Sequence, residues 1–355
     1  MKLVLKKRHA RQVARVLKLN SRKATSREKL RYKRRKIPWR GQRQTSRLSV
    51  PHALAVGGDQ NRKTLNRFFA KLRELSLERR LRVILDFSDT KVTLVTGTLL
   101  FIAELDRIKR ILKDDFSVGI DGVRDKRVNQ LLCQIGLYAL CDVAQPGLSE
   151  ELLDPTVRHW RYATGERVNE QTNKAFESFE GRLSPELAKG MWKSVSEAVV
   201  NSVEHAYLEP RGVNGPRMHS SRWWMFSQEK EGQLTVAVCD LGIGIPRSLP
   251  IRWEPSLLAR VFNSLRGEGP DLRAIRAALR VGASSTGGDH RGNGLPQIWN
   301  TLQSAQNASI QILSNRAQLS WNGAVKKEFA LEFTESIFGT IIIWTVDVNE
   351  PTHEG

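Results

Sequence analysis

Residues Met191–Tyr207, with the sequence MWKSVSEAVVNSVEHAY, constrain the fold more than any other stretch. As one helix, this run places Glu197, Asn201 and Glu204 or His205 on a single polar face, because side chains three and four positions apart stack on a helix. The opposite positions are small or apolar and suit packing against a sheet. A carboxylate one turn before a carboxamide can deprotonate a water or hydroxyl while the amide oxygen ligates Mg²⁺. The run therefore predicts a helix that covers a sheet and presents a polar site.

Two glycine-containing segments follow this helix in the chain. The first, VAVCDLGIGIP, is an apolar strand pattern that ends at Asp240 and continues through Gly242 and Gly244. Asp240 alone fits a turn carboxylate that bonds its own backbone. The second segment, GGDHRGNGLPQI, is rich in glycine and leads into a helical pattern. We expect a strand with a tight turn from the first and a mobile loop before a helix from the second.

In this order, the three segments resemble the GHKL ATP-binding family (HATPase_c-like), which includes type II topoisomerases, mismatch-repair ATPases, heat-shock chaperones and histidine kinases. The likeness is greatest to the bacterial anti-sigma serine kinases. The resemblance covers residues 170–350 and implies an α/β sandwich of the Bergerat type with a mixed sheet. It also implies that the chain binds ATP and Mg²⁺.

The resemblance assigns roles to individual residues. It makes Asn201 the Mg²⁺ ligand, Glu197 the catalytic base, and Asp240 the acceptor for the adenine amino group. Gly242 and Gly244 then let the chain turn close to the base. A late segment, FGTIIIWTV, resembles the last strand of the family and implies that Thr340 lies near the adenine.

Residues Ser284–Gly294 resemble the phosphate-facing lid of that family. The resemblance places Gly292 and Gly294 at the nucleotide, and the residues beside them, Arg291 with His290 and Asn293, are further candidates for binding it. An arginine suits phosphate oxygens, although a solvated lid charge explains Arg291 equally well. Asn293 stands between two glycines, where it also suits a left-handed backbone with no role at the ligand.

Residues 51–145 alternate between helix and strand patterns. We expect helices at 61–77, 95–112 and 126–140 and strands at 81–87 and 116–120. This order resembles the STAS domain of anti-sigma antagonists and sulfate-transporter tails, in which a Ser or Thr before a Gly opens a helix. Thr96–Gly97 stands at that place. Because the acidic residue that usually precedes the hydroxyl is absent, helix capping is the favoured interpretation of Thr96.

Residues 146–169 are interrupted by proline and glycine, and we expect them to connect the two domains. A helix is expected at 170–180, and Ser184–Pro185 is a start signal for the helix that carries Glu197. The pair Trp223–Trp224 lies in a predicted hairpin. Strand aromatics favour a core position, although an exposed pair would indicate an interface.

Positive charge is concentrated at the start of the chain. Of the formal net charge of +20, residues 1–47 carry +18 and the other 308 residues carry +2. Because apolar residues are scarce between 20 and 47, we expect residues 1–50 to form a basic, disordered extension. Such an arm suits the phosphates of DNA or RNA, with Tyr32 and Trp39 available to stack on bases. A solvated tail, or an arm that binds an acidic partner, fits the same pattern.

Composition indicates the compartment. No run of about 18 apolar residues occurs, so no transmembrane segment is expected, and the first residues lack the apolar core of a secretory signal. The three cysteines, Cys133, Cys141 and Cys239, lack paired metal spacing and favour buried thiols in a reducing compartment. We expect a cytoplasmic protein.

Three functions remain open at this stage. The first is a regulatory ATPase, in which ATP binding and slow hydrolysis drive lid closure and switch a protein partner. The second is a serine/threonine kinase of the anti-sigma type, with Glu197 deprotonating the acceptor hydroxyl. The third is a nucleic-acid-binding protein that holds ATP as a structural ligand. Each is compatible with a homodimer.

Overall fold

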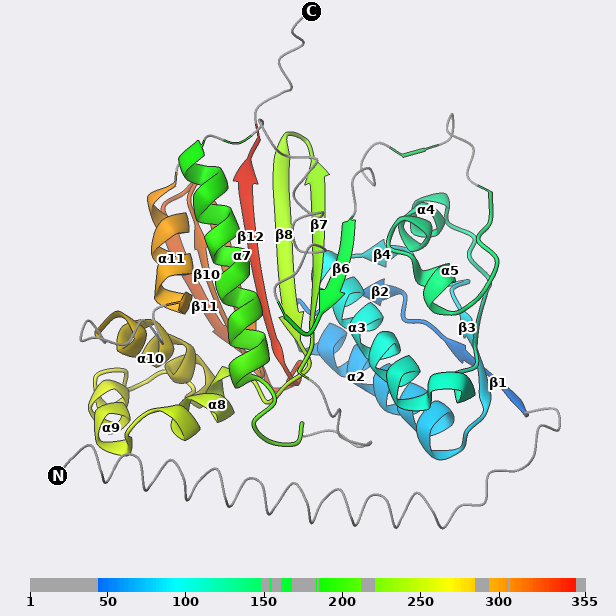
Figure 1. Ribbon diagram of the computed structural model, residues 1–355, viewed down its shortest axis with the longest axis horizontal. Helices are drawn as coiled ribbons and strands as arrows, with labels where there is room; N and C mark the ends of the chain where they lie inside the picture. Colours follow the sequence, from blue (N-terminus) through cyan, green and yellow to red (C-terminus); the bar gives the residue numbers. More distant parts are fainter. Residues whose placement is uncertain are drawn as a thin grey trace, which may run out of the picture. The chain divides into compact units, whose positions relative to one another are not determined.

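Parallel strands and the helices that connect them form the first part of the fold (Figure 1). The computed structural model describes residues 44–147, 153–154, 161–167, 183, 185–211, 221–284, 294–305 and 307–348. The first sheet has the order β1-β3-β5, and both of its pairings are parallel. Its strands are β1 (Thr45–Ser49), β3 (Arg82–Asp86) and β5 (Val118–Asp121). A short parallel pair lies beside it, β2 (Ala53–Leu54) with β4 (Val92–Thr93).

Helices supply the crossovers that parallel strands require. Helix α3 (Val95–Leu112) has the bounds expected from the sequence, and it is apolar around most of its surface because it is buried on several sides. The other helical elements here are α2 (Asp59–Arg73), a π-helical turn (Glu74–Glu78), a 3₁₀ turn (Lys113–Asp115), α4 (Lys126–Gln134) and α5 (Leu137–Leu140). The single helix expected at 126–140 is wrong, because Gly136 takes a φ of 74° and ends α4.

The second sheet has seven strands in the order β11-β10-β9-β12-β8-β7-β6. They are β6 (Arg161–Gly165), β7 (Trp223–Lys230), β8 (Gln233–Asp240), β9 (Ser309–Ser314), β10 (Ala317–Asn322), β11 (Lys327–Glu332) and β12 (Thr340–Asp347). Every pairing is antiparallel, so the expected mixed sheet is wrong. Short turns join β7 to β8 and β9 to β10 to β11, and such turns permit only antiparallel neighbours.

Helices cover one face of this sheet (Figure 1). They are α7 (Pro185–His205), α10 (Pro270–Ser284) and α11 (Gly294–Ser304), while α8 (Ile245–Arg252) and α9 (Pro255–Asn263) pack around α10. Val195 and Val199 of α7 share a buried core with Val236 and Val238 of β8. The apolar side of the predicted Glu197 helix therefore lies against the sheet, as expected.

The opposite face of the second sheet packs on α3. Trp224 and Phe226 belong to the same buried core as Phe101, and Trp224 Nε1 donates to Asp106 at 3.0 Å. Trp223 points to the other face and joins the core under α7. Both tryptophans are fully buried, so the core interpretation is confirmed and the exposed-interface alternative is wrong.

Two boundaries differ from the sequence-based expectation. The basic extension was expected to reach residue 50, but Thr45–Ser49 forms β1, whose Leu48 pairs with Leu85 of β3. The connector 146–169 contains β6, the edge strand beside β7, and its Tyr162 ring packs edge-on against Phe226. Partner strands supply the ordering in both places, which a polar segment does not indicate by itself.

Candidate functional site

The polar face of α7 meets the start of α11. Glu197 and Asn201 are both partly buried on this face. A Cβ atom at Gly294 would overlap Glu197 Oε2 and lie 3.3 Å from Asn201 Nδ2, so the α11 backbone comes directly against these two side chains. The structure therefore brings the first and third sequence motifs together at Gly294.

Asp240 ends β8 and is paired in register with Thr340, the first residue of β12. Its carboxylate is buried and accepts a hydrogen bond from the Gly242 backbone N–H at 2.9 Å. The backbone N–H and the hydroxyl of Thr340 also donate to it. The turn bond expected for an isolated aspartate is thus formed, and Thr340 adds donors that sequence spacing alone does not reveal.

Burial raises the pKa of Asp240 to about 7, because a charged carboxylate loses its hydration there. The hydrogen bonds from Gly242 and Thr340 and the positive charge of Arg211 act in the opposite direction. Among the residues that the structure describes, its direct donors are the neutral groups of Gly242 and Thr340. Asp240 consequently changes charge near neutral pH, which is typical of carboxylates at functional sites.

The glycine turn after Asp240 is fixed to the end of α7. The Ile243 N–H donates to the carbonyl of Ala206 at 2.8 Å, and a Cβ at Gly242 would overlap that same carbonyl. Gly244 has a φ of 76°, where a side chain would be strained. One rigid connection therefore joins the Asp240 turn to the helix that carries Glu197 and Asn201.

Sequence reasoning missed Ser314, the last residue of β9, and Asn315, which follows it; both support this turn. Ser314 Oγ accepts from the Ile245 N–H at 2.8 Å and lies 3.1 Å from Thr340 Oγ1. Asn315 Nδ2 donates to the Ile243 carbonyl at 2.9 Å. The only sequence signal is a Ser-Asn pair between two strand patterns, which predicts a turn and no more.

Tyr207, just after α7, is a second residue that the motifs did not single out. Its hydroxyl accepts from the Leu241 N–H at 3.2 Å and donates to the Arg222 carbonyl. Burial raises the pKa of this hydroxyl well above its ordinary value, so it remains protonated. Tyr207 thus fixes the first residue of the Asp240 turn.

His205 contacts α8. Its Nδ1 atom lies at hydrogen-bonding distance from the Arg252 guanidinium, which also donates to the Glu204 carbonyl at 2.8 Å. Burial and the Arg252 charge lower the pKa of His205 and favour the neutral ring. Arg252 therefore accounts for the position of this histidine at the helix end.

Four of the predicted site residues, His290, Arg291, Gly292 and Asn293, lie outside the described residues. The lid therefore stays a prediction, with only its first and last expected residues, Ser284 and Gly294, in described helices.

The polar side chains of α7 include oxygen atoms that suit Mg²⁺. Within the part of the chain that the structure describes, no group of three or more His, Cys, Asp or Glu side chains could hold a metal. Mg²⁺ commonly takes only one or two protein oxygens and completes its shell with phosphates and waters. The amide oxygen of Asn201, with the Glu197 carboxylate one turn away, fits that mode of binding.

Thr96 does not cap α3. The N-cap residue is Leu94, and Thr96 is the second residue of the helix, so the capping interpretation is wrong. A Cβ at Gly97 would overlap the backbone of Leu54 and Ala55. The glycine after Thr96 is therefore required for close packing of α3 on β2.

Two general expectations can be compared with the fold. Cys133, Cys141 and Cys239 are free and buried, as the sequence predicted. Among the described helices, none combines the length and apolar character needed to cross a membrane.

Comparison of the sequence with protein-family models and with curated proteins finds no match. The geometry around Asp240 and α7 is therefore the basis for assigning a function.

Proposed function

We propose that this chain is a regulatory ATP-binding protein of the GHKL type that binds ATP with Mg²⁺ and hydrolyses it slowly. The observation that carries the proposal is Asp240, a buried carboxylate whose hydrogen-bond donors within the described part of the chain are the neutral groups of Gly242 and Thr340. A carboxylate has about four acceptor positions, so it can also accept from an exocyclic amino group. Adenine offers such a donor.

The proposed roles follow the arrangement around Asp240. Asp240 and Thr340 would bind the adenine edge, and the turn through Gly242 and Gly244 would lie beside the base. Asn201 would hold Mg²⁺, which when bound would neutralise phosphate charge. Asn201 lies on α7, and the end of α7 contacts the turn after Asp240 through Ala206. This contact supports one continuous ligand site.

Glu197 is the proposed base for the attack of water on the terminal phosphate. Its contact with Gly294 places the carboxylate at the start of α11, directly after the proposed lid. Closure of the lid would change the affinity for a protein partner, and a coupling of about 1–3 kcal/mol is enough to switch binding. Transfer to a Ser or Thr hydroxyl would require the same base.

An ATP titration of wild-type protein beside Asp240→Asn tests the adenine assignment. We expect Mg²⁺-dependent binding that the amide variant weakens. Asp347→Asn is the matched control, because Asp347 ends β12 at the opposite end of the same strand pair. Equal affinities of wild type and Asp240→Asn would reject the proposal.

Glu197→Gln tests the chemistry separately from binding. We expect retained ATP affinity and phosphate release reduced by a factor of about 10²–10⁴, the usual contribution of a general base. Glu231→Gln, in the exposed β7–β8 turn, serves as the control. Labelled γ-phosphate appearing on protein in place of free phosphate would assign the kinase function. Full phosphate release from Glu197→Gln would assign the base to another group.

A further inference from the structure

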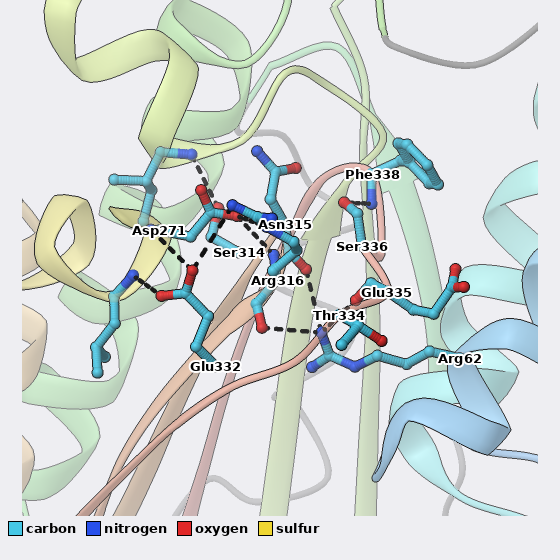
Figure 2. A network of polar contacts seen from close by, with 12 residues as sticks. Arg62, Asp271, Ser314, Asn315, Arg316, Glu332, Thr334, Glu335, Ser336 and Phe338 are labelled. Carbon is cyan, nitrogen blue, oxygen red and sulfur yellow. Dashed lines mark hydrogen bonds and ion pairs between the residues drawn. The ribbon is translucent and has the colours of Figure 1, made fainter. Parts of the chain in front are cut away.

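One side of α2 binds the second sheet (Figure 2). Asp59, Arg62 and Asn66 lie at positions i, i+3 and i+7 of this helix and therefore share a face. Asp59 Oδ1 accepts from the N–H groups of Thr334 and Glu335 at 2.7 and 3.0 Å. Asn66 Nδ2 donates to the Glu335 carboxylate at 3.1 Å and to the Ser336 carbonyl at 3.0 Å. Helix α2 thus holds residues 334–336, in the first half of the loop between β11 and β12.

Arg62 is the centre of this contact and is only 1% exposed. Its Nη1 atom donates to the carbonyls of Asn315, Arg316 and Glu335 at 3.1–3.2 Å. Its guanidinium carbon lies 3.8 Å from the centre of the Phe333 ring. Burial lowers the pKa of Arg62 to about 10, although the nearby Asp59 charge opposes this effect.

A buried guanidinium bonded to neutral carbonyls is costly, because carbonyl dipoles replace lost hydration less completely than a carboxylate does. Helix α2 would bury an apolar residue at this place at lower cost. The presence of an arginine here is therefore best explained by what its guanidinium holds, the backbone carbonyls of residues 315 and 316.

The turn 314–316 has three connections. Ser314 and Asn315 support the turn after Asp240, and the Asn315 N–H donates to the carbonyl of Gly339, the residue before Thr340, at 3.1 Å. The Arg316 N–H donates to the Asp271 carboxylate at 2.9 Å, at the start of α10. Helix α10 ends at Ser284, where the proposed lid begins. Two of the carbonyls that Arg62 binds therefore belong to a turn that contacts both the Asp240 site and α10.

We propose that Arg62 is a positioning residue for the Asp240 site, so that the N-terminal α/β layer determines how well the second sheet binds its ligand. This inference rests on the proposed ATP-binding function. Arg62 acts through the backbone of Asn315 and does not itself touch the ligand. Any change that moves α2 would shift the hydrogen-bonding groups around the proposed adenine position.

Isothermal ATP titrations of Arg62→Lys and Arg62→Ala, below their unfolding temperatures, test the proposal. We expect the affinity to fall about tenfold for Arg62→Ala, equivalent to about 1.4 kcal/mol, and by a smaller factor for Arg62→Lys, which keeps a charged donor. Arg67→Ala is the matched control, because Arg67 is an exposed arginine on the same helix. Unchanged affinity in both Arg62 variants would overturn the inference.

A double-mutant cycle with Asp240→Asn separates positioning from a general loss of stability. If Arg62 acts through the Asp240 site, Arg62→Lys changes the affinity less than twofold once Asp240→Asn is present, because coupled residues are not additive. Equal factors in the two backgrounds would assign Arg62 a merely structural role.

Hydrogen exchange in the ligand-free protein tests the inference independently of ATP. The N–H groups of Asn315 and Ile337, which bond to Gly339 and Asn315, should exchange at least tenfold faster in Arg62→Lys than in wild type. The N–H of Val236 in the middle of β8 should be unaffected. If wild type binds no ATP but the exchange changes as expected, the proposed function fails and the positioning role stands. Unchanged exchange would reject the positioning role.

Discussion

Two carboxylates of this fold are buried in opposite electrostatic surroundings. Glu104 of α3 is fully buried and bonded by three arginines, Arg73 at 3.0 Å, Arg107 at 3.2 Å and Arg211 at 2.6 Å. Burial alone would raise the pKa of Glu104, but the three positive charges hold it well below its ordinary value. Asp240 is almost as buried, yet its direct donors are neutral, and its pKa is raised to about 7.

The difference lies in what surrounds each carboxylate. Cations surround Glu104 and fix its charge, so it connects α2, α3 and the segment after α7 permanently. The charge of Asp240 depends on pH near neutrality, and its carboxylate oxygens can accept further hydrogen bonds from a ligand. A buried carboxylate is therefore a candidate for function when its charge is left uncompensated, and a structural element when arginines compensate it.

The largest effect is expected from Glu104→Gln. The substitution leaves three buried arginines around a neutral side chain, and breaking a buried ion pair in this way typically costs about 3–5 kcal/mol. Denaturant unfolding monitored by circular dichroism measures the loss. Glu74→Gln is the control, because its solvent-screened pair with Lys71 should contribute little to stability. Similar small losses for both variants would show that Glu104 is not the structural carboxylate.

Asp240→Asn should give the reverse pattern. At pH 8 the wild-type fold buries an ionised carboxylate whose raised pKa costs stability, so the neutral amide should not lower the free energy of unfolding and should raise it. Its ATP affinity should nevertheless fall by about 1–3 kcal/mol, because the adenine amino group loses an acceptor. Unfolding and titration on the same preparations check this. A large loss of stability with normal ATP affinity would exchange the roles of the two carboxylates.

Local sequence patterns were sufficient to predict several of the elements that hold the two carboxylates. The bounds of α3, the β7–β8 hairpin and the position of Asp240 at a strand end all follow from periodicity and glycine spacing. Strand β1 was missed, because residues 45–49 are mostly polar and are ordered only by pairing with β3.

The residues around the two carboxylates were not predictable in the same way. Arg211 binds Glu104 over 107 positions of sequence, and Arg62 binds Asn315 over 253. An arginine that bonds a distant backbone leaves no local pattern, and the sequence contains many arginines that do not. Tertiary contacts of this kind decide which buried charge is compensated, and therefore which one is available for binding.

The pH dependence should distinguish the two carboxylates further. The pKa of Asp240 is raised from 3.8 to about 7 on folding, so the stability that its neutral form provides is complete below pH 4 and lost as pH rises through 7. The lowered pKa of Glu104 gives the opposite sign: its contribution is present above about pH 4.5 and lost as pH falls. Unfolding of wild type and Asp240→Asn between pH 5 and 8 isolates the first effect as their difference.

ATP affinity should rise with pH over the same interval, because the ionised Asp240 accepts a stronger hydrogen bond from the adenine amino group than the protonated carboxyl does. The slope should approach, and not exceed, about 1.4 kcal/mol per pH unit below the pKa. Asp240→Asn should show no such rise. A wild-type affinity that is flat from pH 6 to 8, after correction for ATP protonation, would show that Asp240 does not titrate at the base site.

The smallest effect is expected from Arg211, which connects the two carboxylates. Its Nη1 atom donates to Glu104 and its Nε atom donates to the Phe338 carbonyl at 2.6 Å, two residues before Thr340. Its positive charge also lowers the pKa of Asp240, without a direct hydrogen bond between the two side chains.

Arg211→Gln should therefore raise the pH midpoint of ATP binding by roughly one pH unit or less. Arg211→Lys, which keeps the charge, should shift it less. Glu104 retains Arg73 and Arg107 in both variants, so the fold should tolerate them better than Glu104→Gln. An unchanged midpoint in Arg211→Gln would mean that the two carboxylates are electrostatically independent, and that only backbone contacts link the α3 ion cluster to the base site.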